Sequence, residues 1–140
     1  MSDRALRLAA AAVALAGVAV AGYLTWAHYA DSSVVCVVGG SCEKVQQSSY
    51  ALIAGIPVAA LGLTSYTAIV ALIAWNSPGA RLTAAALALI GAVFGAYLLV
   101  VQLFVIDAIC TWCLANDVLI APALAVLTGL RLRVDSARER

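Results

Sequence analysis

The chain has 140 residues, of which 65% are hydrophobic and 11% are charged, and its formal net charge is +1. An average soluble domain is about 45–50% apolar and about 25% charged, so this composition excludes an ordinary soluble domain and indicates a protein that folds in lipid. The small net charge gives no support for a nucleic-acid partner, and none is expected. Because no linker-like stretch and no internal repeat divides the chain, we expect a single domain, residues 1–140.

Four apolar segments are long enough to cross a membrane as helices. A bilayer core of about 30 Å requires about 20 helical residues. The apolar runs are continuous and rich in alanine and leucine, rather than alternating, which favours helices over strands. We therefore predict an all-α fold, an integral membrane four-helix bundle with an outer loop or short helix that caps its site. The predicted spans are residues 8–27, 56–75, 82–106 and 111–130, and the outer loop is 28–55.

Turn and interface residues agree with these ends. Pro57 is expected in the first turn of the second span, where its missing N–H costs nothing. The sequence at 76–79, Asn-Ser-Pro-Gly, predicts a turn between the second and third spans. Tryptophans at predicted span ends are typical of the aromatic belts of membrane proteins; they are Trp26, Trp75 and Trp112.

The basic residues predict the orientation of the bundle. With four spans, seven arginines fall on one face and only Lys44 falls on the other. Because segments rich in Lys and Arg stay in the cytoplasm, we expect a multi-pass plasma-membrane protein with cytoplasmic termini. The loop 28–55 and the turn 107–110, which hold all four cysteines, are then extracytoplasmic. The seven are Arg4, Arg7, Arg81, Arg131, Arg133, Arg138 and Arg140.

The N-terminus has a second interpretation. Arg4 and Arg7, the apolar run and Ala19-Val20-Ala21 together resemble a signal peptide with a cleavage site. Cleavage would leave three spans in the same orientation, so charge does not separate the alternatives. We favour retention because the apolar run continues to Ala27, which is long enough to span a bilayer.

One pair of cysteines forms the C-x-x-C motif Cys110-Thr111-Trp112-Cys113 at the expected start of the fourth span. Unpaired N–H groups and the helix dipole at such a position stabilise a thiolate, and the thiolate is the nucleophile. The two-residue spacing lets one sulfur attack while the other resolves the product. The motif therefore predicts a redox-active pair.

The other pair, Cys36 and Cys42, lies in the outer loop with Gly39 and Gly40 between its members. A loop of this kind is able to swing between a soluble partner and the membrane surface. Thiol–disulfide exchange requires such a transfer, through a mixed disulfide. An oxidising outer compartment would preserve the disulfides that result.

Three other interpretations of the cysteines stay open. Two structural disulfides in a non-catalytic membrane protein fit an oxidising compartment, although a rigid cross-link seldom needs a C-x-x-C at a helix start. Zinc ligation is disfavoured by the five-residue spacing in the outer pair, so we expect no metal. Buried inert thiols are disfavoured because even numbers of cysteines in outer loops usually pair.

The ordered motifs resemble one family. The segment from Cys36 to Tyr50, reading CVVGGSCEKVQQSSY, is followed by Gly-Ile-Pro-Val-Ala at 55–59, by Gly62 and then by the C-x-x-C motif. Taken together these residues resemble the vitamin K epoxide reductase family, specifically its bacterial members, over about residues 8–130. The ordered set is specific, whereas a C-x-x-C alone would be a weak signal.

The resemblance implies a four-helix bundle around a quinone of the menaquinone, ubiquinone or vitamin K type. Bacterial members reoxidise a secreted thioredoxin-fold thiol oxidase, a DsbB-like role, whereas animal members reduce vitamin K quinone and its epoxide. By motif position, Cys36 and Cys42 resemble the shuttle pair, and Cys42 would exchange with Cys110. Cys113 would face the quinone and form a charge-transfer or covalent adduct with it. A quinone-epoxide reductase is the nearest alternative activity.

The chain also departs from the family pattern. Some bacterial members carry a fused thioredoxin-like domain, whereas this chain ends ten residues after Leu130, so we expect a separate DsbA-like partner. Some relatives have a tyrosine four residues after the second C-x-x-C cysteine, where this chain has Asp117. This difference puts inherited quinone hydrogen bonding and inhibitor sensitivity in doubt.

Five polar residues are candidate quinone contacts. Ser48 matches a family serine near the active site, and the amphipathic segment 42–50 is expected to lie over the bundle as a lid. Asp117 interrupts the fourth span and is either a proton relay for the quinone or a hydrated residue at a helix N-terminus. The candidates are Ser48, Ser49, Tyr50, Asn116 and Asp117.

Overall fold

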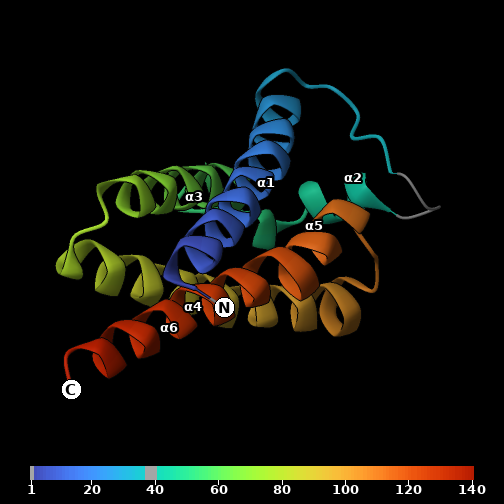
Figure 1. Ribbon diagram of the computed structural model, residues 1–140. Coiled ribbons are helices and arrows are strands. Elements are labelled where there is room, and N and C mark those ends of the chain that lie inside the picture. Colours follow the sequence, from blue (N-terminus) through green and yellow to red (C-terminus); the bar gives the residue numbers. More distant parts are fainter. Residues whose placement is uncertain (1, 37–40) are drawn as a thin grey trace.

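A computed structural model of the protein describes residues 2–36 and 41–140. Four long helices dominate it (Figure 1), and each is long and apolar enough to cross a membrane. The predicted all-α membrane bundle is therefore confirmed. The helices are α1 (Asp3–Tyr29), α3 (Val58–Trp75), α4 (Pro78–Val100), which continues into the π-helical segment Val101–Ile106, and a fourth built from α5 (Thr111–Ala115), the π-helical segment Asn116–Ile120 and α6 (Ala121–Arg138).

The turn between α3 and α4 forms where the sequence predicts it. Asn76 ends α3 in a left-handed conformation, with φ 61°, which asparagine tolerates better than most residues. The Ser77 hydroxyl then caps α4 by accepting a hydrogen bond from the N–H of Ala80 at 3.1 Å. Pro78 occupies the first helical turn, where a missing N–H costs nothing. The turn therefore reverses the chain tightly.

The start of α3 differs from the prediction for Pro57. A short antiparallel hairpin precedes the helix, in which β1 (Leu52–Ile53) pairs with β2 (Ile56–Pro57). Ala54 and Gly55 make the turn with φ values of 52° and 81°. Pro57 thus ends the second strand and lies at the N-cap of α3, rather than in its first turn. The predicted second span begins two residues too early for this reason.

Small residues on α1 allow α3 to approach closely. Ala10, Ala14 and Ala21 are buried, and they pack in one cluster with Ile69 of α3. At Gly17, a β-carbon would lie 2.6 Å from the ring of Tyr66, which is far inside contact distance. Only glycine therefore lets the Tyr66 ring lie flat against α1, and this ring forms part of the site described below.

Charged residues join the helix ends opposite the cysteines, and we call this end the basic end. Arg131, which is 2% exposed, pairs with Asp3 at 3.2 Å and donates to the Asn76 side chain at 2.6 Å. Arg81 forms ion pairs with Asp135 and with Asp3. Arg131 and Asp135 both lie on α6, which extends to Arg138, past the predicted end of the fourth span at 130.

Figure 1 shows how this arrangement divides the molecule. The α3–α4 turn and the C-terminus lie toward one end of the bundle, and α2 (Cys42–Gln46) and α5 lie toward the other. The amphipathic segment 42–50 therefore forms α2 followed by a single 3-10 turn, Ser49–Ala51. This segment leads directly into the β1–β2 hairpin.

Candidate redox site

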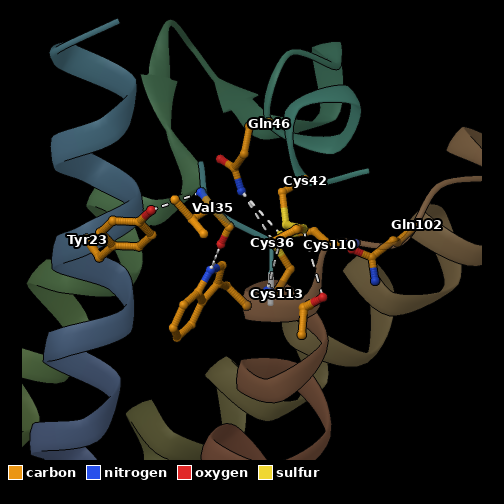
Figure 2. Close-up of a disulfide and its surroundings, with 10 residues drawn as sticks. Tyr23, Val35, Cys36, Cys42, Gln46, Gln102, Cys110 and Cys113 are labelled. Atoms are coloured by element: carbon orange, nitrogen blue, oxygen red, sulfur yellow. Dashed lines mark hydrogen bonds between the residues drawn. A yellow bond between two sulfur atoms is a disulfide. The ribbon is translucent and has the colours of Figure 1, made fainter. Parts of the chain in front are cut away.

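The four cysteines gather at the end of the bundle that carries α2 and α5 (Figure 2), in two pairs of different redox state. Cys36 and Cys42 form a disulfide with a Cα–Cα distance of 6.0 Å. Cys110 and Cys113 are free thiols whose sulfur atoms lie 2.6 Å apart. Gly39 and Gly40, which the sequence suggests as a flexible link, lie outside the described residues.

The C-x-x-C motif lies at the start of a helix, as its sequence predicts. Cys110 is the N-cap of α5, and its sulfur accepts a hydrogen bond from the N–H of Cys113 at 3.3 Å. The Cys113 thiol also donates to the Cys110 sulfur. This thiol hydrogen bond, followed by those from the backbone N–H of Cys113 and from Gln46, lowers the pKa of Cys110 to about 7 against the opposing effect of burial. Cys110 is thus prepared to act as a thiolate near neutral pH.

Aromatic side chains hold the Cys36 segment against this helix. The N–H of Val35 donates to the Tyr23 hydroxyl at 3.0 Å, and its carbonyl accepts from the Trp112 indole at 2.7 Å. The Thr111 hydroxyl lies 3.9 Å from the Cys36 sulfur. Both residues inside the C-x-x-C therefore contact the segment that carries the outer disulfide.

A backbone hydrogen bond places the other half of the outer pair. The N–H of Ser41 donates to the carbonyl of Ile109 at 2.7 Å. Cys42 follows Ser41 in the chain and Cys110 follows Ile109, so this bond holds one cysteine of the outer pair near one cysteine of the inner pair. Cys42 is 2% exposed, whereas Cys36 is only half-buried. Cys36 is therefore the more accessible residue of the outer pair, and Cys42 is enclosed beside the C-x-x-C.

Two glutamines that the sequence analysis did not single out contact the inner pair. Gln46, one turn after Cys42 in α2, donates from Nε2 to the Cys113 sulfur at 3.2 Å and lies 3.9 Å from that of Cys110. Gln102 accepts from the N–H of Cys110 at 3.0 Å. A sequence signal existed for each, since Gln102 is the only amide in the predicted third span and Gln46 follows a cysteine at helical spacing.

The Gln102 amide has a fixed orientation. Because its Oε1 is occupied by the N–H of Cys110, its Nε2 must point the other way. Among the described residues, this Nε2 is the one buried side-chain nitrogen or oxygen atom with no hydrogen-bond partner. Gln102 is 2% exposed and is one of the residues around the cavity described next.

A cavity of about 400 Å³ opens beneath the cysteines. Its walls are mainly apolar and come from α1, α3, α4 and the fourth helix. Small-molecule sites typically measure about 300–1,000 Å³ and combine apolar walls with a few polar groups, so the cavity has the size and the lining of a small-molecule site. Its polar or thiol-bearing lining residues are Gln46, Ser48, Tyr50, Ser65, Tyr66, Gln102, Cys113, Asn116 and Asp117.

Four of the five predicted quinone contacts line this cavity. Ser48 and Tyr50 reach it from the segment after α2, and Asn116 and Asp117 reach it from the fourth helix. Ser49 does not line it within the described part of the chain, and it lies exposed beside Gln47 on the outer surface. The alternation follows from the 3-10 turn, which directs neighbouring side chains to different sides.

A hydrogen-bonded chain of three side chains forms one wall. The Tyr66 hydroxyl donates to Oδ1 of Asn116 at 2.5 Å, and Nδ2 of Asn116 donates to Oδ1 of Asp117 at 3.0 Å. Asp117 is 6% exposed, and a β-carbon at Gly95 would lie 3.0 Å from its carboxylate. Asp117 is thus buried inside the bundle, where it lines the cavity. Tyr66 is a site residue that the sequence analysis missed.

Comparison with known proteins agrees with the cysteine geometry. No curated protein matches the chain. The sequence does match the Vitamin K epoxide reductase family over residues 8–128, a range that includes all four cysteines and every residue that lines the cavity. Proteins of this family are, in general, membrane oxidoreductases that act on thiols and quinones. The match covers most of the 140 residues, and the chain therefore belongs to the vitamin K epoxide reductase family.

Proposed function

We propose that the protein oxidises the dithiol of a secreted thioredoxin-fold protein and transfers the two electrons to a membrane quinone, so that disulfide bonds form in secreted proteins. One observation carries the proposal. Cys113 lines an apolar cavity of about 400 Å³, while its partner Cys110 is buried beneath the bridged outer pair. This arrangement supports a path from a protein dithiol, through two cysteine pairs, to a small apolar oxidant.

The outer pair accepts electrons first. A thiolate of the partner attacks the half-buried Cys36 sulfur and breaks the Cys36–Cys42 bond, which leaves Cys42 as the departing thiolate. The second partner thiol then displaces Cys36, so the partner leaves with a disulfide and the outer pair is a dithiol. Attack at Cys36 is supported by exposure, because Cys42 is buried.

The inner pair starts this step as a Cys110–Cys113 disulfide and is reduced by these electrons. The Cys42 thiolate attacks the Cys110 sulfur of a Cys110–Cys113 disulfide, and Cys36 resolves the mixed bond. The outer disulfide is thereby restored and the inner pair becomes a dithiol. That product, with a bridged outer pair and two inner thiols, has the redox state of the described structure.

The inner dithiol then reduces the quinone. Cys113 faces the cavity, and when Cys110 is a thiolate the hydrogen bond between the two sulfurs lets the Cys113 proton move to Cys110, which leaves a Cys113 thiolate at the cavity wall. As the Cys110–Cys113 disulfide forms, the pair gives the quinone two electrons and the proton held by Cys110, and the second proton of the quinol comes through Asp117. We assign Asn116, Ser48 and Tyr50 to quinone contact, and Asp117 to the supply or relay of a proton.

We also propose that the cysteine end faces the outside of the cell and that both termini are cytoplasmic. The seven arginines belong to the N-terminal segment, the α3–α4 turn and the C-terminal part of the chain. Arg81 and Arg131 join these three regions at the basic end. The positive-inside rule then assigns that end to the cytoplasm.

The test is an assay of the purified protein in detergent with a reduced thioredoxin-fold protein, with and without menaquinone or ubiquinone. We expect loss of partner thiols that depends on the quinone, and no turnover in Cys110→Ala or Cys113→Ala. Cys36→Ala should lose activity with the protein donor but retain more of it with a small dithiol. Equal losses with both donors would contradict the shuttle assignment.

Two other outcomes would replace the proposal. Faster turnover of a quinone epoxide than of the quinone would assign the protein to epoxide reduction with the same cysteines. A folded sample with no turnover, whose four cysteines resist mild thiols as two stable disulfides, would indicate a structural role, because structural bridges exchange slowly.

A further inference from the structure

Gln46 contacts the inner dithiol from outside the bundle. It is the last residue of α2, and its Nε2 lies 3.2 Å from the Cys113 sulfur. In Figure 2 its side chain points down onto the C-x-x-C from above. Neither the motif nor the helix that carries it supplies this contact, because Gln46 lies 67 residues earlier in the chain.

The two sulfurs of the inner pair differ in the donors that surround them. Cys110, at the N-cap, accepts from the Cys113 thiol and from the Cys113 backbone N–H. Cys113 lies within α5, so the free N–H groups at the helix start do not point toward its sulfur. Among the residues that the structure describes, Gln46 is the only donor to the Cys113 sulfur.

The chemistry of a thiolate decides which end of the amide suits the sulfur. A deprotonated sulfur only accepts hydrogen bonds, and the donor of a glutamine side chain is Nε2. Nε2 of Gln46 is the atom that lies 3.2 Å from the Cys113 sulfur. This contact becomes stronger when Cys113 carries negative charge, because hydrogen bonds to ionised acceptors are about twice as strong as neutral ones.

The contact also lies where charge develops. Gln46 and Cys113 both line the cavity, so the donor stands beside the sulfur that meets the substrate. A donor already oriented toward the site of developing charge lowers a barrier without reorganising during the reaction. Gln46 is half-buried, which reduces competition from water for the same sulfur.

We propose that the side-chain amide of Gln46 is a catalytic group that stabilises the Cys113 thiolate during electron transfer to the substrate in the cavity. This inference rests on the proposed function for its substrate, but the thiolate contact itself is independent of it. The same five-residue helix thus supplies Cys42 to the outer pair and a donor to the inner pair.

The first experiment measures the thiolate without any quinone. In a Cys110→Ala background, Cys113 is the only free thiol while Cys36 and Cys42 remain bridged, and its alkylation by N-ethylmaleimide follows the thiolate fraction. We expect Gln46→Leu to slow alkylation about tenfold, since hydrogen bonds to charged groups are the stronger class. Gln46→Glu, which presents a carboxylate to the sulfur, should slow it further.

Gln47 provides matched controls. It is the exposed neighbour of Gln46 and has no side-chain contact with the cysteines within the described residues. Gln47→Leu and Gln47→Glu should leave the alkylation rate within twofold of the parent, which separates the contact from a general effect of polarity or charge. If Gln46 served only as a cover, Gln46→Leu would expose Cys113 and make alkylation faster, and that result would overturn the inference.

The second experiment uses the chain with all four cysteines and a single turnover of reduced enzyme with menaquinone. We expect Gln46→Leu to lower the first-order rate about tenfold with little change in the quinone concentration for half-saturation, as for a group that acts mainly in the transition state. An unchanged rate would overturn the role of Gln46. No reduction by the parent protein would refute the proposed function instead, while the alkylation result would still decide the thiolate contact.

Discussion

The side chain of Gln102 accepts the backbone N–H of Cys110 at 3.0 Å, and the two residues are 2% and 0% exposed. Loss of the acceptor would leave a buried N–H unsatisfied, which costs about 1–3 kcal/mol. We therefore expect Gln102→Met to lower the free energy of unfolding by about 1–3 kcal/mol and to slow quinone reduction. Denaturant unfolding in detergent measures the first effect. Gln47→Met, at an exposed site, should change neither, and equal behaviour of the two variants would contradict the prediction.

Cys110 should titrate below the range of an ordinary cysteine. Its pKa is lowered to about 7 from the usual 9.0, first of all by the hydrogen bond from the Cys113 thiol. The reduced protein should thus gain thiolate absorbance in the ultraviolet as the pH rises through about 7, and lose it as the pH falls. Cys113→Ala removes the largest cause, so the midpoint should move upward. A midpoint that stays in place would refute this assignment of the shift, and Cys110→Ala should lack the transition.

Two glycines of α1 provide a matched test of helix packing. A β-carbon at Gly17 would lie 2.6 Å from the Tyr66 ring, whereas one at Gly22 would make an ordinary contact of 3.8 Å with Leu63. Overpacking typically costs about 1–3 kcal/mol, so Gly17→Ala should destabilise the protein by that amount. Gly22→Ala should be neutral or stabilising by up to about 1 kcal/mol, because alanine favours helices. Thermal unfolding in detergent compares them, and an equal effect of both substitutions would contradict the packing argument.

The free energy of unfolding should depend strongly on the Asp3 carboxylate at the basic end. Asp3 pairs with Arg131, which is 2% exposed, and removing one partner of a buried pair costs about 3–5 kcal/mol. Because the Asp3 side chain is 15% exposed, we expect a loss near the lower bound, about 3 kcal/mol, for Asp3→Asn. Arg138→Ala, at an exposed position, is the control. Unfolding curves that coincide for the two variants would show that the pair adds little to stability.

The sequence predicted four long apolar helices, as the structure has them, because bilayer thickness fixes the length of a helix that crosses it. It failed where structure depends on distant contacts. The charged stretch after Leu130 resembles a tail until Asp3 and the α3–α4 turn are placed beside it. The β1–β2 hairpin has two residues per strand, which is too short for an alternating pattern to appear.

The same limit applies to the site. The cysteines could be recognised because their spacing is local, and four of the five suggested polar contacts line the cavity. Gln46 and Gln102 have no periodic pattern, and each gains its role from a cysteine on another helical element. Tyr66 has a hydrophobic position in a span, and only the Asn116 side chain opposite it reveals a polar function for its hydroxyl.

The pair between Asp3 and Arg131 joins residues 128 positions apart, which has a consequence for biogenesis. At about 5–20 residues per second of synthesis, Asp3 is made roughly 6–26 seconds before Arg131. Throughout that interval the Arg131 partner of the Asp3 carboxylate does not yet exist. The ion pair that ties α1 to α6 at the basic end therefore forms only after the fourth helix has been synthesised.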